Sequence, residues 1–247
     1  MTIPAAEALN SEQRVPTEKD VDTVSRQLGR PARDIVEIGA RCVCGNPLVA
    51  TTAPRLSSGI PFPTTYYLTH PVATSACSRV EAEGLMVTMN EQLSKDPELA
   101  KAYAAAHEHY LAVRDAIGKR SGVGEVPEIA GVSAGGMPDR VKCIHVLVGH
   151  SLAAGPGTNP LGDQALEAIA QWWRPDVCSC QGAWDTEGPA PSKDKSRHVR
   201  TQAGDPEKKR LERAAKRAAD EASSNSKAGS SAAGNSAADD TNQAEGN

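Results

Sequence analysis

The chain turns from a glycine-rich loop into a helix at Ser133-Ala-Gly-Gly-Met-Pro-Asp-Arg-Val-Lys-Cys-Ile-His-Val-Leu-Val-Gly-His150. Pro138 and Asp139 are typical of the first positions of a helix, and Gly155 marks its end. The same stretch carries two cations, one thiol and two imidazoles. Because these groups gather at one loop-to-helix transition, we expect the stretch to form one wall of a polar pocket.

The segments on either side predict a small sheet followed by helices. Residues that favour strands flank the turn at Cys42–Pro47, which indicates a hairpin, and residues 64–70 predict a third strand. Helical patterns cover residues 17–28, 74–93, 96–117 and 159–173, and Gly84 is expected to weaken the second helix without ending it. This order favours an α+β fold, with a small antiparallel sheet of about three strands and about four to five helices.

Composition sets the limits of the folded part. Residues 185–247 are rich in Ser, Ala, Gly, Asn and charge, which predicts a disordered tail. Residues 17–184 are expected to form a single domain, after a flexible arm at residues 1–16. The tail contains equal numbers of basic and acidic residues, so the net charge of -4 lies on residues 1–184. This negative balance argues against a general nucleic-acid binder.

The sequence also predicts where the protein is found. Its apolar runs are all shorter than the roughly 20 residues that span a bilayer, so no membrane span is expected. The N-terminus lacks the basic start and apolar core of a signal peptide. A cytoplasmic location is therefore predicted, and the six cysteines are expected to be thiols or metal ligands rather than a disulfide framework.

Four motifs stand out along the chain. They are Pro61-Phe-Pro-Thr-Thr-Tyr-Tyr-Leu-Thr69, Ser78-Arg-Val-Glu-Ala-Glu-Gly84, Ala106-His-Glu-His-Tyr110 and Gly135-Gly-Met-Pro-Asp-Arg-Val-Lys-Cys-Ile-His145. In this order, over about residues 24–165, the chain resembles the actinobacterial family called "domain of unknown function 501". The resemblance implies no established activity. Some members are named septum formation initiator family protein after a neighbouring gene, which implies a link to cell division without a mechanism.

The loop before the predicted helix has the groups of an anion site. Gly135 and Gly136 leave backbone N–H groups free at a helix start, where the helix dipole is positive, and Arg140 and Lys142 lie beside them. In the alternative interpretation, Asp139 caps the helix and nothing binds there. The pattern alone leaves both interpretations open.

Helical geometry restricts which groups after this loop can act together. Successive residues are about 100° apart on a helix, so Cys143 and His150 share a face while His145 lies about 200° from Cys143. On a regular helix a joint metal chelate by Cys143 and His145 is therefore not expected. Cys143 is then a small buried hydrophobe, and His150 is either a hydrogen-bonded core histidine or a pocket residue.

A second group of polar residues lies on the helix predicted at 96–117. His107 shares a face with Tyr103, Tyr110 and Arg114, and an imidazole in these surroundings suits acid–base chemistry or a phosphate contact. It equally suits a polar network that orders a helix interface. The predicted ligand-binding residues are Arg79, His107, Arg114, Arg140, Lys142 and His150, with His107 and His150 as candidate catalytic residues.

Four cysteines are the right number for a closed zinc site. Cys42-Val-Cys44 lies in the hairpin turn and Cys178-Ser-Cys180 lies beyond the last helix, so a tetrahedral Zn²⁺ would clip the two segments together. A disulfide and unligated thiols are the alternatives. The turn of the family resembles Arg-Cys-x-x-Gly-x-Pro, so Cys44 and the later pair look like additions to its pattern.

These patterns together predict a binding or regulatory domain whose polar pocket takes a small anionic ligand, such as a phosphorylated one. The cations would neutralise the anion and the histidines would donate hydrogen bonds. Two alternatives stay open. One is a hydrolase acting on a phosphate-containing substrate, with His107 or His150 as general acid or base, and the other is a non-enzymatic interaction protein with a division-related partner.

Overall fold

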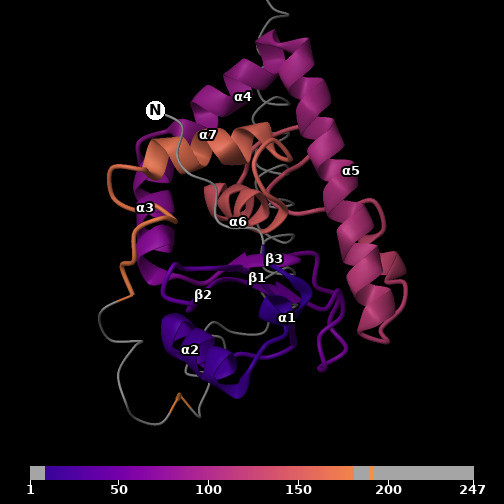
Figure 1. Ribbon diagram of the computed structural model, residues 1–247. Helices are drawn as coiled ribbons and strands as arrows, with labels where there is room; N and C mark the ends of the chain where they lie inside the picture. The colour runs from indigo at the N-terminus through magenta and orange to yellow at the C-terminus, as the bar shows by residue number, and fades with distance from the viewer. Residues whose placement is uncertain (1–8, 181–189, 192–247) are drawn as a thin grey trace, which may run out of the picture. The chain divides into compact units, whose positions relative to one another are not determined.

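Three strands form one sheet, and the turn that follows Arg41 joins the first two (Figure 1). The computed structural model describes residues 9–180, 190 and 191. Strands β1 (Ile35–Arg41), β2 (Pro47–Thr52) and β3 (Tyr66–Leu68) pair in this order in one antiparallel sheet. The predicted hairpin, third strand and α+β class are confirmed.

Helices occupy both sides of this sheet. In chain order they are α1 (Ser11–Arg14), α2 (Glu18–Leu28), α3 (Pro71–Ala82), α4 (Leu85–Lys95), α5 (Pro97–Arg120), the 3-10 turn η1 (Pro127–Ile129), α6 (Ile144–Ala154) and α7 (Pro160–Ile169). In Figure 1, α2 lies on one face of the sheet and α6 on the other, with α7 beyond α6. Strand β2, at the centre, is buried along its whole length because both of its faces are covered.

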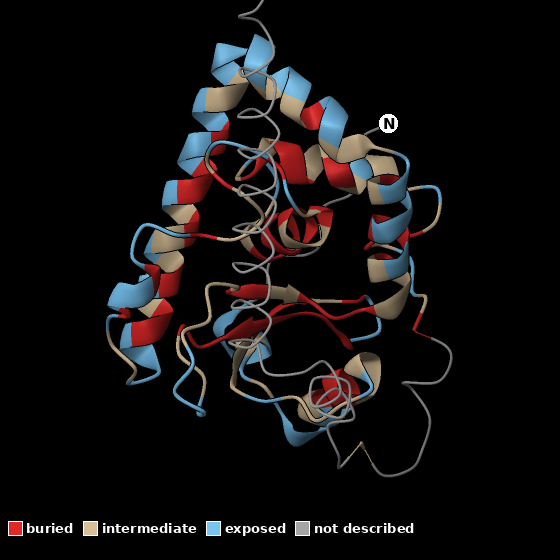
Figure 2. Cartoon of the chain, turned by 180° about the vertical axis from the view of Figure 1, so that it is seen from behind, coloured by how far each residue is buried: buried red, intermediate tan, exposed pale blue. Residues whose placement is uncertain are grey.

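Helix α6 forms the centre of the core. It contacts all three strands as well as α3 and α7, and Figure 2 shows it buried on nearly every side. Ile144, Leu147 and Val148 are fully buried, and each such side chain stabilises the fold by about 1.5–3 kcal/mol. Gly149 permits the close approach to the sheet, because a Cβ atom there would lie only 3.1 Å from the Tyr66 carbonyl oxygen.

The predicted helix starts are confirmed where a local side chain caps the helix. Thr17 and Asp20 form a capping box at the start of α2. Asp96 accepts hydrogen bonds from the first amides of α5, and Asn159 accepts one from the Gly162 amide of α7. In each case the cap lies within a few residues of the amides that it satisfies, which is why the sequence predicts these boundaries.

The helix predicted over residues 74–93 is two helices. Gly84 adopts a left-handed backbone with φ of 91°, so it separates α3 from α4 instead of merely weakening one long helix. The prediction that the helix continues through Gly84 is therefore wrong. This break and the short helix α1, which lies in the predicted flexible arm, explain why the described residues form more helices than the four to five expected.

The start of α6 was also predicted wrongly, because the helix begins at Ile144 and not at Pro138. Gly135 and Gly136 both have a left-handed backbone and fold residues 135–139 into turns. Val141 then pairs with the Asn90 side chain of α4, whose oxygen accepts from its amide and whose nitrogen donates to its carbonyl. These backbone bonds hold residues up to Cys143 outside the helix.

The domain boundaries at residues 16 and 184 remain predictions. Residues 1–8 and most of the predicted tail, residues 185–247, lie outside the described residues. Contacts divide the chain into a unit of Met1–Asp194 and a unit of Lys195–Asn247. The described elements all belong to the first unit.

Candidate metal centre

The turn between β1 and β2 holds two cysteines at the end of the hairpin. The Cys42 amide donates to the Asn46 carbonyl at 2.8 Å, and the Gly45 amide donates to the Cys42 carbonyl at the same distance. Gly45 has a φ of 90°, which glycine adopts without strain. The turn is therefore tight, and Cys42 and Cys44 lie at one end of the sheet.

The second pair of cysteines comes from the segment after α7. Trp173 is buried in the core, with its ring centroid 5.8 Å from that of His70 at the start of α3. Arg174 and Asp176 form a 2.6 Å ion pair in the residues that follow. Trp173 therefore anchors the chain to the core, and the ion pair braces the residues that lead to Cys178 and Cys180, which meet the first pair.

The sulfur atoms of Cys42, Cys44, Cys178 and Cys180 all lie within 4.8 Å of one another. A tetrahedral Zn²⁺ with Zn–S bonds of about 2.3 Å needs sulfur atoms roughly 3.8 Å apart, so small side-chain shifts can close the four on one ion. Cys44 and Cys178 are exposed, which gives an ion a path from solvent. Four thiolates leave no open position, which fits a structural ion rather than a catalytic one.

Burial and hydrogen bonding act in opposite directions on these thiols. Burial raises the pKa of both Cys42 and Cys180. It also acts to raise the pKa of Cys44, but hydrogen bonds from the Asn46 amide and from the thiols of Cys178 and Cys180 outweigh it and lower the pKa. Cys44 therefore gives up its proton before Cys42 and Cys180. Because a metal ion binds the thiolate forms, its affinity for the cluster rises with pH.

A buried histidine lies directly behind the cluster. Burial lowers the pKa of His70 to about 4, so its imidazole is neutral at neutral pH. Its Nδ1 accepts a hydrogen bond from the Ala73 amide, which places the proton on Nε2, 3.4 Å from the Cys180 sulfur. An imidazole N–H pointed at a sulfur stabilises the thiolate form that a metal requires. His70 is 110 residues away from Cys180 along the chain, so residue spacing gives no signal that it belongs to this site.

Two of the residues predicted to bind an anion lie in the interior with partners of their own. His107 Nδ1 is 2.9 Å from the Ser133 hydroxyl. The guanidinium of Arg114 donates to the backbone carbonyls of Val132 and Ile129. Both side chains therefore fasten the loop of residues 129–133 to α5, which is the polar-network alternative that the sequence left open.

His150 is enclosed between β3 and α5. Its ring stacks on Tyr66 at 5.4 Å, and its Nε2 lies 3.1 Å from His109 Nδ1. On the other side its Nδ1 lies 3.2 Å from the Asn159 amide nitrogen, which can only donate. His150 is thus a hydrogen-bonded core histidine with both ring nitrogens engaged.

The other three predicted ligands are exposed, one on α3 and two in the loop before α6. The Arg79 guanidinium of α3 lies over the Trp172 ring, 5.5 Å from its centroid. Arg140 and Lys142 lie in the loop before α6 and point to solvent. The structure therefore does not bring the six predicted residues together around one cavity.

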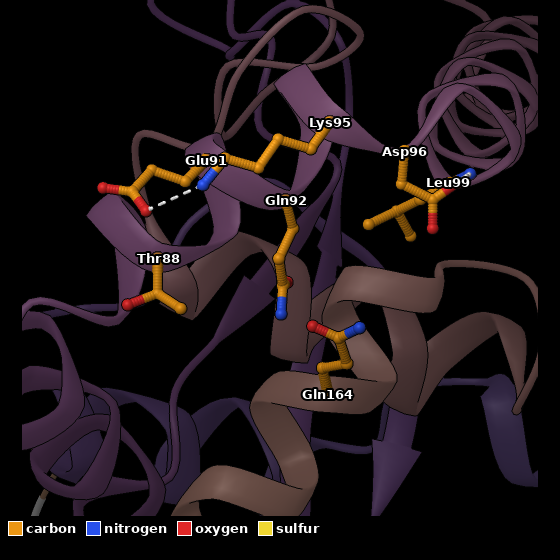
Figure 3. Close-up of a pocket in the computed structure, with 7 residues that line it drawn as sticks. All are labelled: Thr88, Glu91, Gln92, Lys95, Asp96, Leu99 and Gln164. Carbon is orange, nitrogen blue, oxygen red and sulfur yellow. Dashed lines mark hydrogen bonds and ion pairs between the residues drawn. The ribbon is translucent and has the colours of Figure 1, made fainter.

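A hollow of about 360 Å³ lies where α4 meets α5, and Figure 3 shows its lining. The residues around it are Thr88, Glu91, Gln92, Lys95, Asp96, Leu99 and Gln164. Its one cation, Lys95, is engaged with Glu91 at 3.6 Å, and Asp96 adds a second carboxylate. This lining suits an anion poorly, and it includes none of the six predicted ligands.

A carboxylate of the protein itself occupies the N-terminus of α6, where an anion-binding site was predicted. Glu81 of α3 accepts a hydrogen bond from the Ile144 amide at 2.7 Å. A carboxylate at a helix N-terminus satisfies an unpaired amide and interacts favourably with the helix dipole. Neither Asp139 nor Cys143 caps this helix by its side chain. Glu81 was missed because the predicted helix began six residues too early.

The fold and the cysteine cluster define a small α+β domain with a candidate closed metal centre. The sequence profile of the family described as "Protein of unknown function (DUF501)" matches residues 38–167, and the chain belongs to this family. No curated protein and no solved structure matches the sequence. Cys178 and Cys180 lie beyond the matched residues, so the four-cysteine cluster extends outside the family region. Among the described residues, the helices are too short or too polar to cross a membrane.

Proposed function

We propose that the chain is a zinc-binding protein in which Cys42, Cys44, Cys178 and Cys180 hold one structural Zn²⁺. The observation that carries the proposal is the approach of four sulfur atoms to within 4.8 Å of one another from two segments far apart in the sequence. Thiolate sulfur is a preferred ligand of zinc, and four thiolates form a closed tetrahedral shell. The predicted cytoplasmic location supports reduced thiols.

The ion would fasten the segment after α7 to the β1–β2 turn. Trp173 and His70 already pack together beneath that segment, so the metal would lock an arrangement that the core favours. A ligand that binds only the folded state stabilises it by about 2.7 kcal/mol when its concentration is 100 times its dissociation constant. Removal of zinc by a chelator is therefore expected to lower the melting temperature.

The test is the zinc content of the full-length protein, purified without chelator, and of two ligand variants. Cys44→Ser and Cys178→Ser change exposed ligands, so each variant should fold and retain one zinc ion fewer than the wild type. Cobalt substitution should give an intense sulfur-to-cobalt charge-transfer band in the wild type that weakens in both variants.

Ser179→Ala is the matched control for these variants. Ser179 lies between the two ligands and its buried hydroxyl has no hydrogen-bond partner among the described residues, so its removal should leave the zinc content unchanged. An equal zinc content in Cys44→Ser, Cys178→Ser and the wild type would contradict the proposal.

Binding of a small anion by Arg79, His107, Arg114, Arg140, Lys142 and His150 stays a prediction. The interior partners of His107, Arg114 and His150 support a structural role for these three side chains more than a shared pocket. Thermal stability measured with phosphate, polyphosphate and nucleotides tests the prediction, because a bound anion raises the melting temperature. Phosphate hydrolysis and a division-related partner likewise stay predictions.

A further inference from the structure

A second cluster of metal-binding side chains lies where α3 ends and α6 begins. It consists of Glu81, Cys143 and His145, whose donor atoms all lie within 4.8 Å of one another. Cys143 comes just before α6 and has an extended backbone, with φ of -156° and ψ of 115°. Its sulfur therefore reaches His145, which the geometry of a regular helix would have prevented.

The distances within this cluster match those of a metal site. His145 Nδ1 is 3.1 Å from Glu81 Oε1 and 3.8 Å from the Cys143 sulfur. A tetrahedral zinc ion with bonds of about 2.0–2.3 Å needs neighbouring donor atoms roughly 3.3–3.6 Å apart. Both distances from His145 Nδ1 are within a few tenths of an ångström of this spacing, and the Glu81 oxygen and the Cys143 sulfur, which lie within 4.8 Å of each other, can close on one ion by side-chain rotation.

The groups behind the donors hold them in orientation. His145 Nε2 lies 3.1 Å from the Thr74 carbonyl oxygen, which can only accept, so Nε2 carries a proton and Nδ1 is the nitrogen that would bind a metal after releasing its own proton. A histidine that donates its second N–H to a backbone carbonyl is the usual arrangement of a metal ligand. The Ile144 amide holds Glu81 Oε1 in the same way, at 2.7 Å.

Without a metal, His145 and Glu81 form an ion pair across the same atoms. A divalent ion would replace the proton between Nδ1 and the carboxylate and the proton of the Cys143 thiol, so two protons leave as one ion binds. Both His145 and Glu81 keep about a quarter of their side-chain surface exposed, at 28% and 23%, which leaves a path for the ion.

We propose that Glu81, Cys143 and His145 form a second zinc site with an open fourth position. Thiolate, imidazole and carboxylate together are a donor set that zinc accepts. No further Cys, His, Asp or Glu side chain of the described residues joins the group within the same distance. Three protein ligands and one open position are the arrangement of catalytic zinc, in which the open position takes water or a small anion. This site is independent of the four-cysteine site.

All three ligands lie within residues 38–167, the part of the chain that the family profile matches. The second site can therefore be complete in a chain that lacks Cys178 and Cys180. It also uses two of the motifs that carry the family resemblance, at residues 78–84 and 135–145.

The experiment counts zinc ions bound by the full-length protein and by variants at each site. The wild type is expected to bind two ions, and Glu81→Gln and His145→Ala are each expected to bind one. Glu83→Gln is the matched control, because Glu83 is exposed at the end of the same helix and should leave two ions bound. Retention of the four-cysteine ion shows that a variant is folded.

The outcomes separate the two sites. If Glu81→Gln and His145→Ala both retain as many ions as the wild type, the second site is overturned and the four-cysteine site is untouched. If instead His145→Ala binds less zinc than the wild type while Cys44→Ser binds as much, the second site stands and the proposed structural zinc fails.

The open position has its own readout. Cobalt bound to the Cys44→Ser variant should occupy the second site, and azide, a small anionic ligand, should then change its visible spectrum. A spectrum that azide leaves unchanged would overturn the open position.

Discussion

His150 shows what a fully buried imidazole contributes at the scale of one residue. Burial lowers its pKa to about 3, and a positive charge on His109, whenever that ring is protonated, acts in the same direction. Because the Asn159 amide donates to Nδ1, the His150 proton lies on Nε2 and is donated to His109. A second proton on His150 would remove the acceptor that Asn159 needs, so the ring is held neutral.

This neutral state predicts a loss of stability in acid. The unfolded chain takes up a proton on this histidine below its ordinary pKa of 6.5, whereas the folded protein does so only near pH 3. The contribution of neutral His150 to the free energy of unfolding is therefore complete above pH 6.5. It is lost as the pH falls toward 3, by at most about 1.4 kcal/mol per pH unit. Urea unfolding between pH 7 and 5 should show a shallower pH dependence in His150→Gln than in the wild type.

Parallel pH dependences of the two proteins would contradict this prediction. If His150→Gln does not fold, NMR titration of the wild-type ring gives the same information, because the ring should stay neutral throughout this range.

At the scale of elements, α6 and α7 pack through a glycine. A Cβ atom on Gly162 of α7 would lie 2.3 Å from the Ser151 hydroxyl and 2.5 Å from the Leu147 carbonyl oxygen. The carbonyl belongs to the α6 backbone and cannot turn aside, so Gly162→Ala must push the two helices apart. We expect a loss of about 1–3 kcal/mol in the free energy of unfolding, measured with urea.

Gln164→Ala is the control on the same helix. Gln164 faces the hollow in Figure 3, so this change should cost much less than Gly162→Ala. Equal free energies of unfolding for Gly162→Ala and the wild type would contradict the prediction, because they would show that α6 and α7 can move apart at little cost.

The sequence predicted those element boundaries that depend on neighbouring residues. Asp96 and Asn159 cap helices within their own segments, so their patterns were sufficient. The start of α6 depends on Asn90 and Glu81, which come from other helices and are more than fifty residues away along the chain. Because these partners are remote in the sequence, the late start of α6 was not predicted. Glu81 was therefore missed, and Cys143 and His145 were wrongly placed on different faces of one regular helix.

For the whole molecule, the prediction concerns how much of the chain the proposed zinc site needs. A chain ending at Asp194 retains all four cysteines and the whole first unit, so it should bind zinc as the full chain does. A chain ending at Asp176 lacks Cys178 and Cys180 and should bind one zinc ion fewer and melt at a lower temperature. Zinc analysis and thermal unfolding of both chains test this. Equal melting temperatures would show that the last cysteine pair does not stabilise the domain.

The approach of the four cysteines could be predicted from the sequence because it depends on few segments of the chain. Two close pairs of cysteines need only two segments to meet, and the count alone suggests the ligand set. The predicted anion pocket needed six side chains from several elements to converge. Residue spacing shows which groups share a helix face, but it does not show which faces turn inward, and His107, Arg114 and His150 turned inward.

The proposed zinc tie between the β1–β2 turn and the segment after α7 would also act on the unfolded chain. A zinc ion that stays bound to Cys44 and Cys178 would join the two ends of a loop that contains residues 45–167, most of the family region. Closing a loop of this size removes conformational entropy from the unfolded ensemble, by roughly 4–5 kcal/mol on the scale of a covalent cross-link. An unfolding chain would then either keep the metal and remain a closed ring or release the metal first, so zinc dissociation would set the rate at which the domain opens completely.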